Sequence, residues 1–253
     1  MIKYLTEENY NPRMNKINST VIIGIILIIL LYFDLTINKE KSYKNNFLIL
    51  NEILAQENKP PVVKNSKIIE FSGNNFGDVV NSNDINLNSF TVSIWFKTIM
   101  NVTGQIDEAF LVNKGGLGSD LPGVNLNYGI WLNNREKVTG GFETSKGDDY
   151  FLTSQLSYAD GVWHNAMLTF DEELHLLKLY MDGREVANNS TNIGITPDTT
   201  GKQPIRLGAN SLVEKGKING NYTGQLDDIQ VWDYAFTKEQ VASIFDTESK
   251  IPR

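Results

Sequence analysis

Short segments with a two-residue hydrophobic period fill most of this 253-residue chain after Ile68. In Phe90–Lys97 (FTVSIWFK) every second residue from Phe90 to Phe96 is apolar, and Trp95 shares the second face with polar residues. This pattern predicts a half-buried strand. Many short strands separated by Gly, Asn and Asp turns predict an all-β sandwich or barrel. Similar segments occur at Tyr128–Leu132, Trp163–Phe170, Leu174–Met181, Ile205–Leu207 and Leu226–Trp232.

Two local signals add detail to this prediction. Met181–Arg184 contains Asp-Gly, which supplies the positive φ angles that a tight hairpin turn requires. Thr237–Gln240 matches a capping box, in which a threonine side chain and a glutamine three residues later bond each other's backbone N–H groups. We therefore expect a short C-terminal helix that runs through Phe245 and closes the domain.

An apolar run, Val21–Phe33 (VIIGIILIILLYF), follows an N-terminal tail of residues 1–18. Thirteen apolar residues fall short of the roughly 20 that span a bilayer, although flanking residues extend the segment to 19–37. Lys3, Arg13 and Lys16 supply the positive leader of a secretory signal, but no small-x-small cleavage site follows Phe33. An uncleaved transmembrane signal-anchor helix, a cleaved signal and a buried core helix all remain open.

A polar linker, residues 38–65, separates the apolar run from the predicted strands. Phe47–Leu54 has the length of two helical turns, and Lys59-Pro60-Pro61 ends any helix that precedes it. The β-domain is therefore expected at 66–249. This order predicts either a single-pass membrane protein with its domain outside the membrane or, if the N-terminal segment is cleaved, a secreted protein.

Charge and composition exclude several classes of function. The formal net charge is −7, and no run of Lys and Arg interleaves with aromatic residues, so we expect no nucleic-acid partner. The chain has no cysteine, which excludes disulfides, thiolate metal sites and cysteine nucleophiles.

An ordered series of motifs resembles the laminin-G-like jelly-roll modules of the concanavalin A-like superfamily. The resemblance covers about residues 66–249 and implies two antiparallel sheets packed face to face, one of them concave, with rim loops available for ligands. It implies no single function, because the fold hosts lectins, adhesion modules and glycanases. The motifs are Ser89–Lys97, Leu111–Gly115, Asp160–His164, Leu177–Gly183, Leu207–Asn210, Tyr222–Trp232 and Ala235–Gln240.

The residues do not favour catalysis. Glycanases of this superfamily carry Glu-x-Asp-x-x-Glu on one strand, and the chain lacks that arrangement. Asp107-Glu108 and Asp171–Glu173 are adjacent acids of the kind found in turns. His164 begins a predicted strand and His175 lies on a leucine-rich one, and no G-x-S-x-G nucleophile motif accompanies them. The glycine-rich Asn113–Gly118 is interpreted as a turn and not as a phosphate loop.

A metal site is the more plausible chemistry. If Asp227 keeps the two-residue period of Ile229 and Val231, its carboxylate projects to the core side and needs a partner, for which calcium is one candidate. The resemblance implies the same, because several relatives hold a structural calcium with an acid at this position. Asp78 is the candidate second ligand, with carbonyls and water completing the set.

A sugar site requires an aromatic platform with amides or acids beside it. Alternation along Tyr128–Leu132 directs Trp131 outward, and Asn133, Asn134 and Tyr150 are candidate neighbours. An outward tryptophan also commonly packs under a loop or a terminal helix, so both interpretations stand.

These features predict a membrane-anchored or exported binding module that recognises a glycan or another cell-surface ligand without catalysis. Protein adhesion or structural display is the alternative, and a glycan-active hydrolase is the third candidate.

Overall fold

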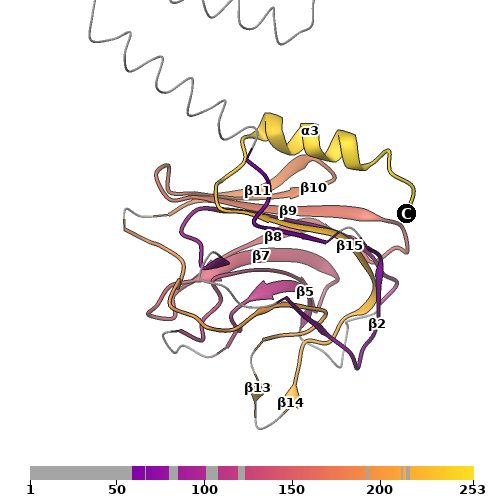
Figure 1. Cartoon of the computed structure of the whole chain (residues 1–253), viewed down its shortest axis with the longest axis horizontal. Helices are drawn as coiled ribbons and strands as arrows, with labels where there is room; N and C mark the ends of the chain where they lie inside the picture. The colour runs from indigo at the N-terminus through magenta and orange to yellow at the C-terminus, as the bar shows by residue number, and fades with distance from the viewer. Residues whose placement is uncertain are drawn as a thin grey trace, which may run out of the picture. The chain divides into compact units, whose positions relative to one another are not determined.

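The computed structural model describes residues 59–65, 67–79, 85–100, 108–118, 123–191, 194–211, 213–214 and 217–253. Within these ranges two antiparallel sheets pack face to face, and a helix covers the outer side of one of them (Figure 1). The predicted all-β sandwich and its C-terminal helix are therefore confirmed. The predicted anchor helix at 19–37 lies outside the described residues. No helix in the described part of the chain is long and apolar enough to cross a membrane.

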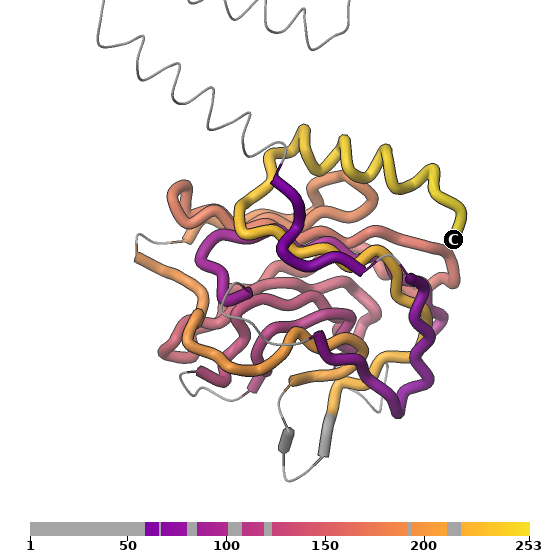
Figure 2. The backbone as a smooth tube through the Cα atoms, viewed as in Figure 1, coloured from indigo at the N-terminus to yellow at the C-terminus, as the bar shows by residue number. Residues whose placement is uncertain are grey.

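The first sheet, called sheet I, pairs the beginning of the described chain with its end. Strands β1 and β2 both pair with β15, so the indigo and yellow-orange segments run side by side (Figure 2). β1 lies within the range that the sequence assigns to the linker, and it already belongs to the sandwich. The order in sheet I is β1 (Val63–Asn65), β15 (Thr223–Trp232), β4 (Phe90–Lys97), β9 (His164–Asp171), β10 (Leu176–Met181) and β11 (Arg184–Ser190), with β2 (Ile69–Ser72) also on β15.

The second sheet, called sheet II, forms the opposite layer. A short hairpin of β13 (Val213–Glu214) and β14 (Lys217–Ile218) projects beyond it, on the side away from sheet I (Figure 1). The order in sheet II is β3 (Gly77–Val79), β12 (Ile205–Leu207), β5 (Glu108–Lys114), β6 (Tyr128–Asn133), β7 (Lys137–Glu143) and β8 (Asp149–Ser157).

The main core lies between the two sheets and follows the predicted alternation. Phe90, Val92, Ile94 and Phe96 of β4 are all fully buried there. The prediction that β4 is only half-buried is wrong, because its second face, including Trp95, is buried as well. The alternation identifies which side chains face the core, but it does not show that a helix covers the other face.

That helix is α3 (Lys238–Glu248), which begins with the predicted capping box at Thr237 and Gln240. It runs one turn beyond the predicted end at Phe245. Trp95 of β4 stacks on Phe245, with ring centroids 5.6 Å apart. A second apolar cluster fills the space between α3 and sheet I. Its buried members are Met167, Tyr180, Trp232, Tyr234, Phe236 and Val241.

The hairpin between β10 and β11 has the predicted turn, with φ angles of 50° at Asp182 and 72° at Gly183. A Cβ atom at Gly183 would lie 2.9 Å from the Phe245 ring, so the glycine also permits close approach of α3. The turn before β10 corrects one prediction. His175 has a φ of 52° and belongs to this turn, so the strand begins at Leu176 and not at Leu174.

Candidate functional site

Asp227 does not face the core, because a β-bulge interrupts the alternation of β15. The register between β15 and β4 shifts between Asp227 and Gln230, and Asp228 takes a φ of 43°. The inserted residue reverses the phase of the strand on its two sides. Ile229 and Val231 face the core, whereas Asp227 turns to the side of α3. The sequence-based orientation of Asp227 is therefore wrong.

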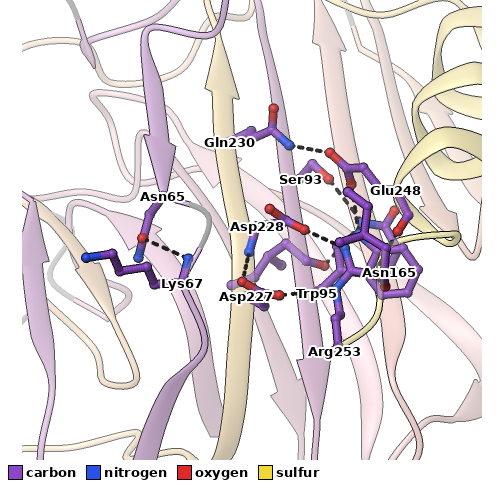
Figure 3. A network of polar contacts seen from close by, with 12 residues as sticks. Asn65, Lys67, Ser93, Trp95, Asn165, Asp227, Asp228, Gln230, Glu248 and Arg253 are labelled. Atoms are coloured by element: carbon purple, nitrogen blue, oxygen red, sulfur yellow. Dashed lines mark hydrogen bonds and ion pairs between the residues drawn. The ribbon is translucent and has the colours of Figure 1, made fainter.

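On the α3 side, Asp227 belongs to a buried network around the C-terminal arginine (Figure 3). The Arg253 guanidinium lies 3.3 Å from Asp227 Oδ2, also pairs with Asp228, and sits 3.8 Å from the centre of the Trp95 ring. Trp95 in turn donates its indole N–H to Glu248, at 2.8 Å. Burial raises the pKa of Asp227, and Arg253 opposes that rise. Burial likewise raises the pKa of Glu248.

Asp78, the other predicted calcium ligand, is paired with a different arginine. Arg206 of β12 donates two hydrogen bonds to the Asp78 carboxylate, at 2.7 and 2.9 Å, and its guanidinium lies 4.2 Å from the centre of the Phe76 ring. Asp78 lies in sheet II and Asp227 in sheet I. Two carboxylates in different sheets, each bound to an arginine, do not fit a shared calcium site. Among the described residues no group of three or more His, Cys, Asp or Glu side chains could hold a metal ion.

Trp131 projects from the outer face of sheet II, as predicted, but it is only 2% exposed. It stacks on Phe110 of β5, with centroids 5.5 Å apart, and packs in a small cluster with Leu126 and Leu117. The Asn210 side chain holds Leu117 in place by bonding its backbone N–H and carbonyl, at 3.2 and 3.1 Å. Trp131 is therefore the base of an apolar cluster and not an open platform.

Phe151 on β8 is a partly exposed member of this cluster, and it meets Trp131 edge to face, with centroids 5.1 Å apart. Phe151 pairs with Gly141 of β7, where a Cβ atom would lie 2.7 Å from the phenyl ring. The absent side chain lets the ring rest against the sheet and reach Trp131. An aromatic surface is thus available on the face of sheet II, and that face is the one that α3 does not cover (Figure 1).

Polar groups lie beside this aromatic surface. Thr139 pairs with Trp131 on one side and with Thr153 on the other, and the two threonine hydroxyls are 3.0 Å apart. Asn133 donates its amide N–H to the Thr139 hydroxyl at 3.4 Å. We call the group Trp131, Asn133, Thr139, Phe151 and Thr153 the outer-face site. Thr153 is exposed to solvent.

Tyr150 does not join the outer-face site. Its ring stacks on Phe142, with centroids 5.3 Å apart, and packs against the main core. Because neighbouring residues of a strand point to opposite faces, Phe151 takes the position that the sequence-based analysis gave to Tyr150. Thr139 and Thr153 were not predicted from the sequence. The signal available for these residues was the Gly140-Gly141 pair inside a strand pattern, which marks a close approach.

Both ring nitrogens of His164 are hydrogen-bonded to carboxylates. Its Nδ1 lies 2.9 Å from Asp182 and its Nε2 lies 3.2 Å from Asp160, so neither ring nitrogen is left to accept a proton from a nucleophile. These contacts join the loop before β9 to the hairpin turn after β10. Burial alone lowers the pKa of His164, but the bonds and charges of Asp182 and Asp160 outweigh it and raise the pKa.

This raised pKa predicts a pH-dependent stability. A histidine whose pKa is higher in the folded state stabilises the protein below its ordinary pKa, and that contribution disappears as the pH rises through the folded pKa. We expect the melting temperature of the wild type to fall more between about pH 6 and about pH 8 than that of His164→Gln. If the melting temperatures of the two proteins changed with pH in the same way, this would contradict a stabilising contact of His164 with Asp160 and Asp182.

A family model described as "Concanavalin A-like lectin/glucanases superfamily" matches residues 71–242. The chain belongs to this superfamily. The matched region runs from the middle of β2 to the middle of α3, so it includes every strand of the lectin/glucanase sandwich from β3 to β15 and the whole outer-face site. The resemblance seen in the sequence is therefore confirmed.

Part of this chain is similar in sequence to curated proteins that are much longer than it is. Pappalysin-1 of Mus musculus is 30% identical over 98 residues, which cover 38% of this chain and 6% of that protein. A Rattus norvegicus protein with Sushi, von Willebrand factor type A, EGF and pentraxin domains is 23% identical over 164 residues, which cover 62% of this chain and 4% of that protein. The chain thus spans only a small part of the relatives that it matches.

Solved structures share the fold of this lectin/glucanase domain. The CBM40 module of a Ruminococcus gnavus sialidase, bound to α2,3-sialyllactose, superposes with a TM-score of 0.59 at 16% identity, covering 73% of this chain and 99% of the module. A leech intramolecular trans-sialidase gives a TM-score of 0.57 at 15% identity, covering 73% of this chain and 28% of that enzyme. At these identities the likeness shows the fold alone.

Proposed function

We propose that this chain is a lectin-like binding module and that it binds a glycan at the outer-face site. The N-terminal apolar segment would retain the module at a membrane, with the domain outside, or direct its export. Binding to a protein partner in adhesion, or a structural display role, is the alternative.

The observation that carries this proposal is the position of Phe151. It presents a partly exposed ring beside Thr153, one strand away from Thr139 on β7 and two strands away from Asn133 on β6. A pyranose ring has apolar C–H faces and polar hydroxyl edges, so it matches an aromatic surface flanked by hydroxyl and amide groups. Trp131 and Gly141 hold the ring in place before any ligand arrives, which reduces the entropy lost on binding.

Sialylated glycans are the first class to test. The structurally similar CBM40 module is bound to α2,3-sialyllactose in its solved structure. An acidic sugar also requires a cation, and strand alternation directs Lys137 to the same face as Thr139. The formal net charge of −7 opposes acidic ligands elsewhere on the molecule, which makes a local cation more important.

We propose binding without catalysis. Both ring nitrogens of His164 are bonded to carboxylates, and the glycanase motif Glu-x-Asp-x-x-Glu is absent from the sequence. The outer-face site offers hydroxyl, amide and aromatic groups. None of these supplies the pair of carboxylates that the two-carboxylate mechanism of glycoside hydrolysis needs.

A glycan array tests the proposal. We expect the wild-type protein to bind a defined subset of glycans and Phe151→Ala to lose at least about tenfold in affinity, because it removes the stacking surface. Ser243→Ala, at an exposed position on α3, is the matched control and should bind like the wild type. The absence of specific glycan binding, or equal binding by Phe151→Ala, would contradict the proposal. Binding to a protein partner alone would favour adhesion.

A further inference from the structure

A hollow of about 540 Å³ lies at the end of the sandwich where β4 ends and β15 begins. Its volume falls in the range of roughly 300–1,000 Å³ that is typical of small-molecule sites. It shares no residue with the outer-face site. Its lining is Lys97, Thr98, Ile99, Met100, Gly161, Thr223, Gly224 and Gln225.

The walls of this hollow are held in place by one buried threonine. The Thr98 hydroxyl donates to the Thr223 carbonyl at 2.7 Å and accepts from the Met100 N–H at 2.8 Å. The Thr98 carbonyl accepts from the Gly161 N–H, also at 2.8 Å. A single residue therefore ties together the end of β4, the start of β15 and the loop before β9, so the hollow is formed before any ligand binds.

Two glycines keep the hollow open. Gly161 has a φ of 83°, and a Cβ atom there would lie 2.9 Å from the Ile99 side chain. Gly224 has a φ of 146°, and a Cβ atom there would lie 2.4 Å from the Lys97 carbonyl oxygen. Both positions combine a backbone conformation that favours glycine with a lack of space for a side chain.

The chemistry of the lining is asymmetric. Ile99 is 83% exposed, and Met100 beside it is partly exposed, so one side presents apolar surface to solvent. Among the described residues that line the hollow, Lys97 is the cation and none is acidic. Within the described part of the chain Lys97 makes no ion pair, although the protein carries a formal net charge of −7. An unpaired, partly buried lysine beside apolar surface favours a ligand with an apolar body and one negative charge.

We propose that this hollow is a second binding site, which takes a small amphiphilic carboxylate. The carboxylate contacts the Lys97 ammonium, and the apolar body packs against Ile99 and Met100. The Gln225 amide and the Thr98–Thr223 backbone are the polar groups that orient the ligand.

Calorimetric titration of the purified protein with 3-phenylpropionate tests this site, with 3-phenylpropionamide as the uncharged probe. We expect saturable one-to-one binding of the acid and at least about tenfold weaker binding of the amide, which lacks the charge-assisted contact. Lys97→Gln and Ile99→Asp should each weaken the binding of the acid by a similar factor.

Leu174→Asp is the matched control, because Leu174 is 70% exposed and lies in the turn at the other end of the sandwich. It should bind the acid like the wild type. Unchanged melting temperatures would show that the three substituted proteins are folded. The proposal is overturned if the acid does not bind saturably, if the amide binds equally well, or if Lys97→Gln and Leu174→Asp behave alike.

Discussion

Arg253→Ala is expected to lower the free energy of unfolding by about 3–5 kcal/mol, the usual effect of removing one partner from a buried ion pair. The Arg253 side chain is 4% exposed and contacts both Asp227 and Asp228, which are 9% exposed at their side chains. Its removal leaves these carboxylates buried and without their cation. It also removes the guanidinium from the Trp95 ring, so we expect the packing of α3 against sheet I to weaken.

Chemical denaturation of the two proteins measures this difference, and its pH dependence identifies the cause. Acids whose pKa is raised by burial, as for Asp227 and Glu248, favour folding when protonated and oppose it as the pH rises through the raised pKa. The deficit of Arg253→Ala should therefore be largest at neutral pH and should shrink toward about pH 4.

Lys250→Ala is the matched control for that experiment. Lys250 pairs with Asp246 at 3.5 Å, but both side chains are more than 70% exposed, and such surface pairs contribute little. We expect no measurable change in stability. If Lys250→Ala lowered the free energy of unfolding as much as Arg253→Ala, the loss of stability would come from any change at the end of the helix and not from the buried network.

Phe90→Ala is expected to lower the free energy of unfolding by about 3–5 kcal/mol as well, because it leaves a cavity in the main core. Phe90 is fully buried and contacts the rings of Tyr128, Phe142 and Phe170, with centroids 5.3 to 6.5 Å apart. These rings come from both sheets, so the cavity would weaken the contact between the layers.

Thermal and chemical denaturation check this prediction, with Phe90→Leu and Leu174→Ala for comparison. Leucine fills part of the space, so Phe90→Leu should lose less stability than Phe90→Ala. Leu174 is exposed, so Leu174→Ala should leave the stability unchanged. Equal stability of Phe90→Ala and the wild type would contradict the position of Phe90 at the centre of the core.

The sequence predicted the features of the fold that depend on neighbouring residues. Alternation identified the core face of β4, Asp182-Gly183 identified the hairpin turn, and Thr237 with Gln240 identified the start of α3. Each of these signals lies within a few residues, so it is readable without knowledge of the tertiary structure. The family resemblance extended them to the pairing of the two sheets.

Features that depend on distant residues were not predictable in this way. The bulge at Asp228 turns Asp227 away from the core and toward Arg253. A prediction that assumes uninterrupted two-residue alternation cannot anticipate such an inserted residue. Leu117 packs in the cluster around Trp131, and the side chain that holds Leu117 there is Asn210, which lies 93 residues further along the sequence. The sequence therefore pointed to Trp131 and Asn133 of the proposed outer-face site, but its partly exposed ring, Phe151, became evident only from the structure.

Amide chemical-shift mapping with the preferred glycan of the array is the most direct measurement of where a ligand binds. We expect the largest shifts on β6, β7 and β8, around Asn133, Thr139 and Thr153, and a strong loss of these shifts in Phe151→Ala. Shifts confined to α3 or to the hollow at Lys97, or no shifts at saturating glycan, would contradict the proposal that this superfamily domain binds glycans on the outer face of sheet II.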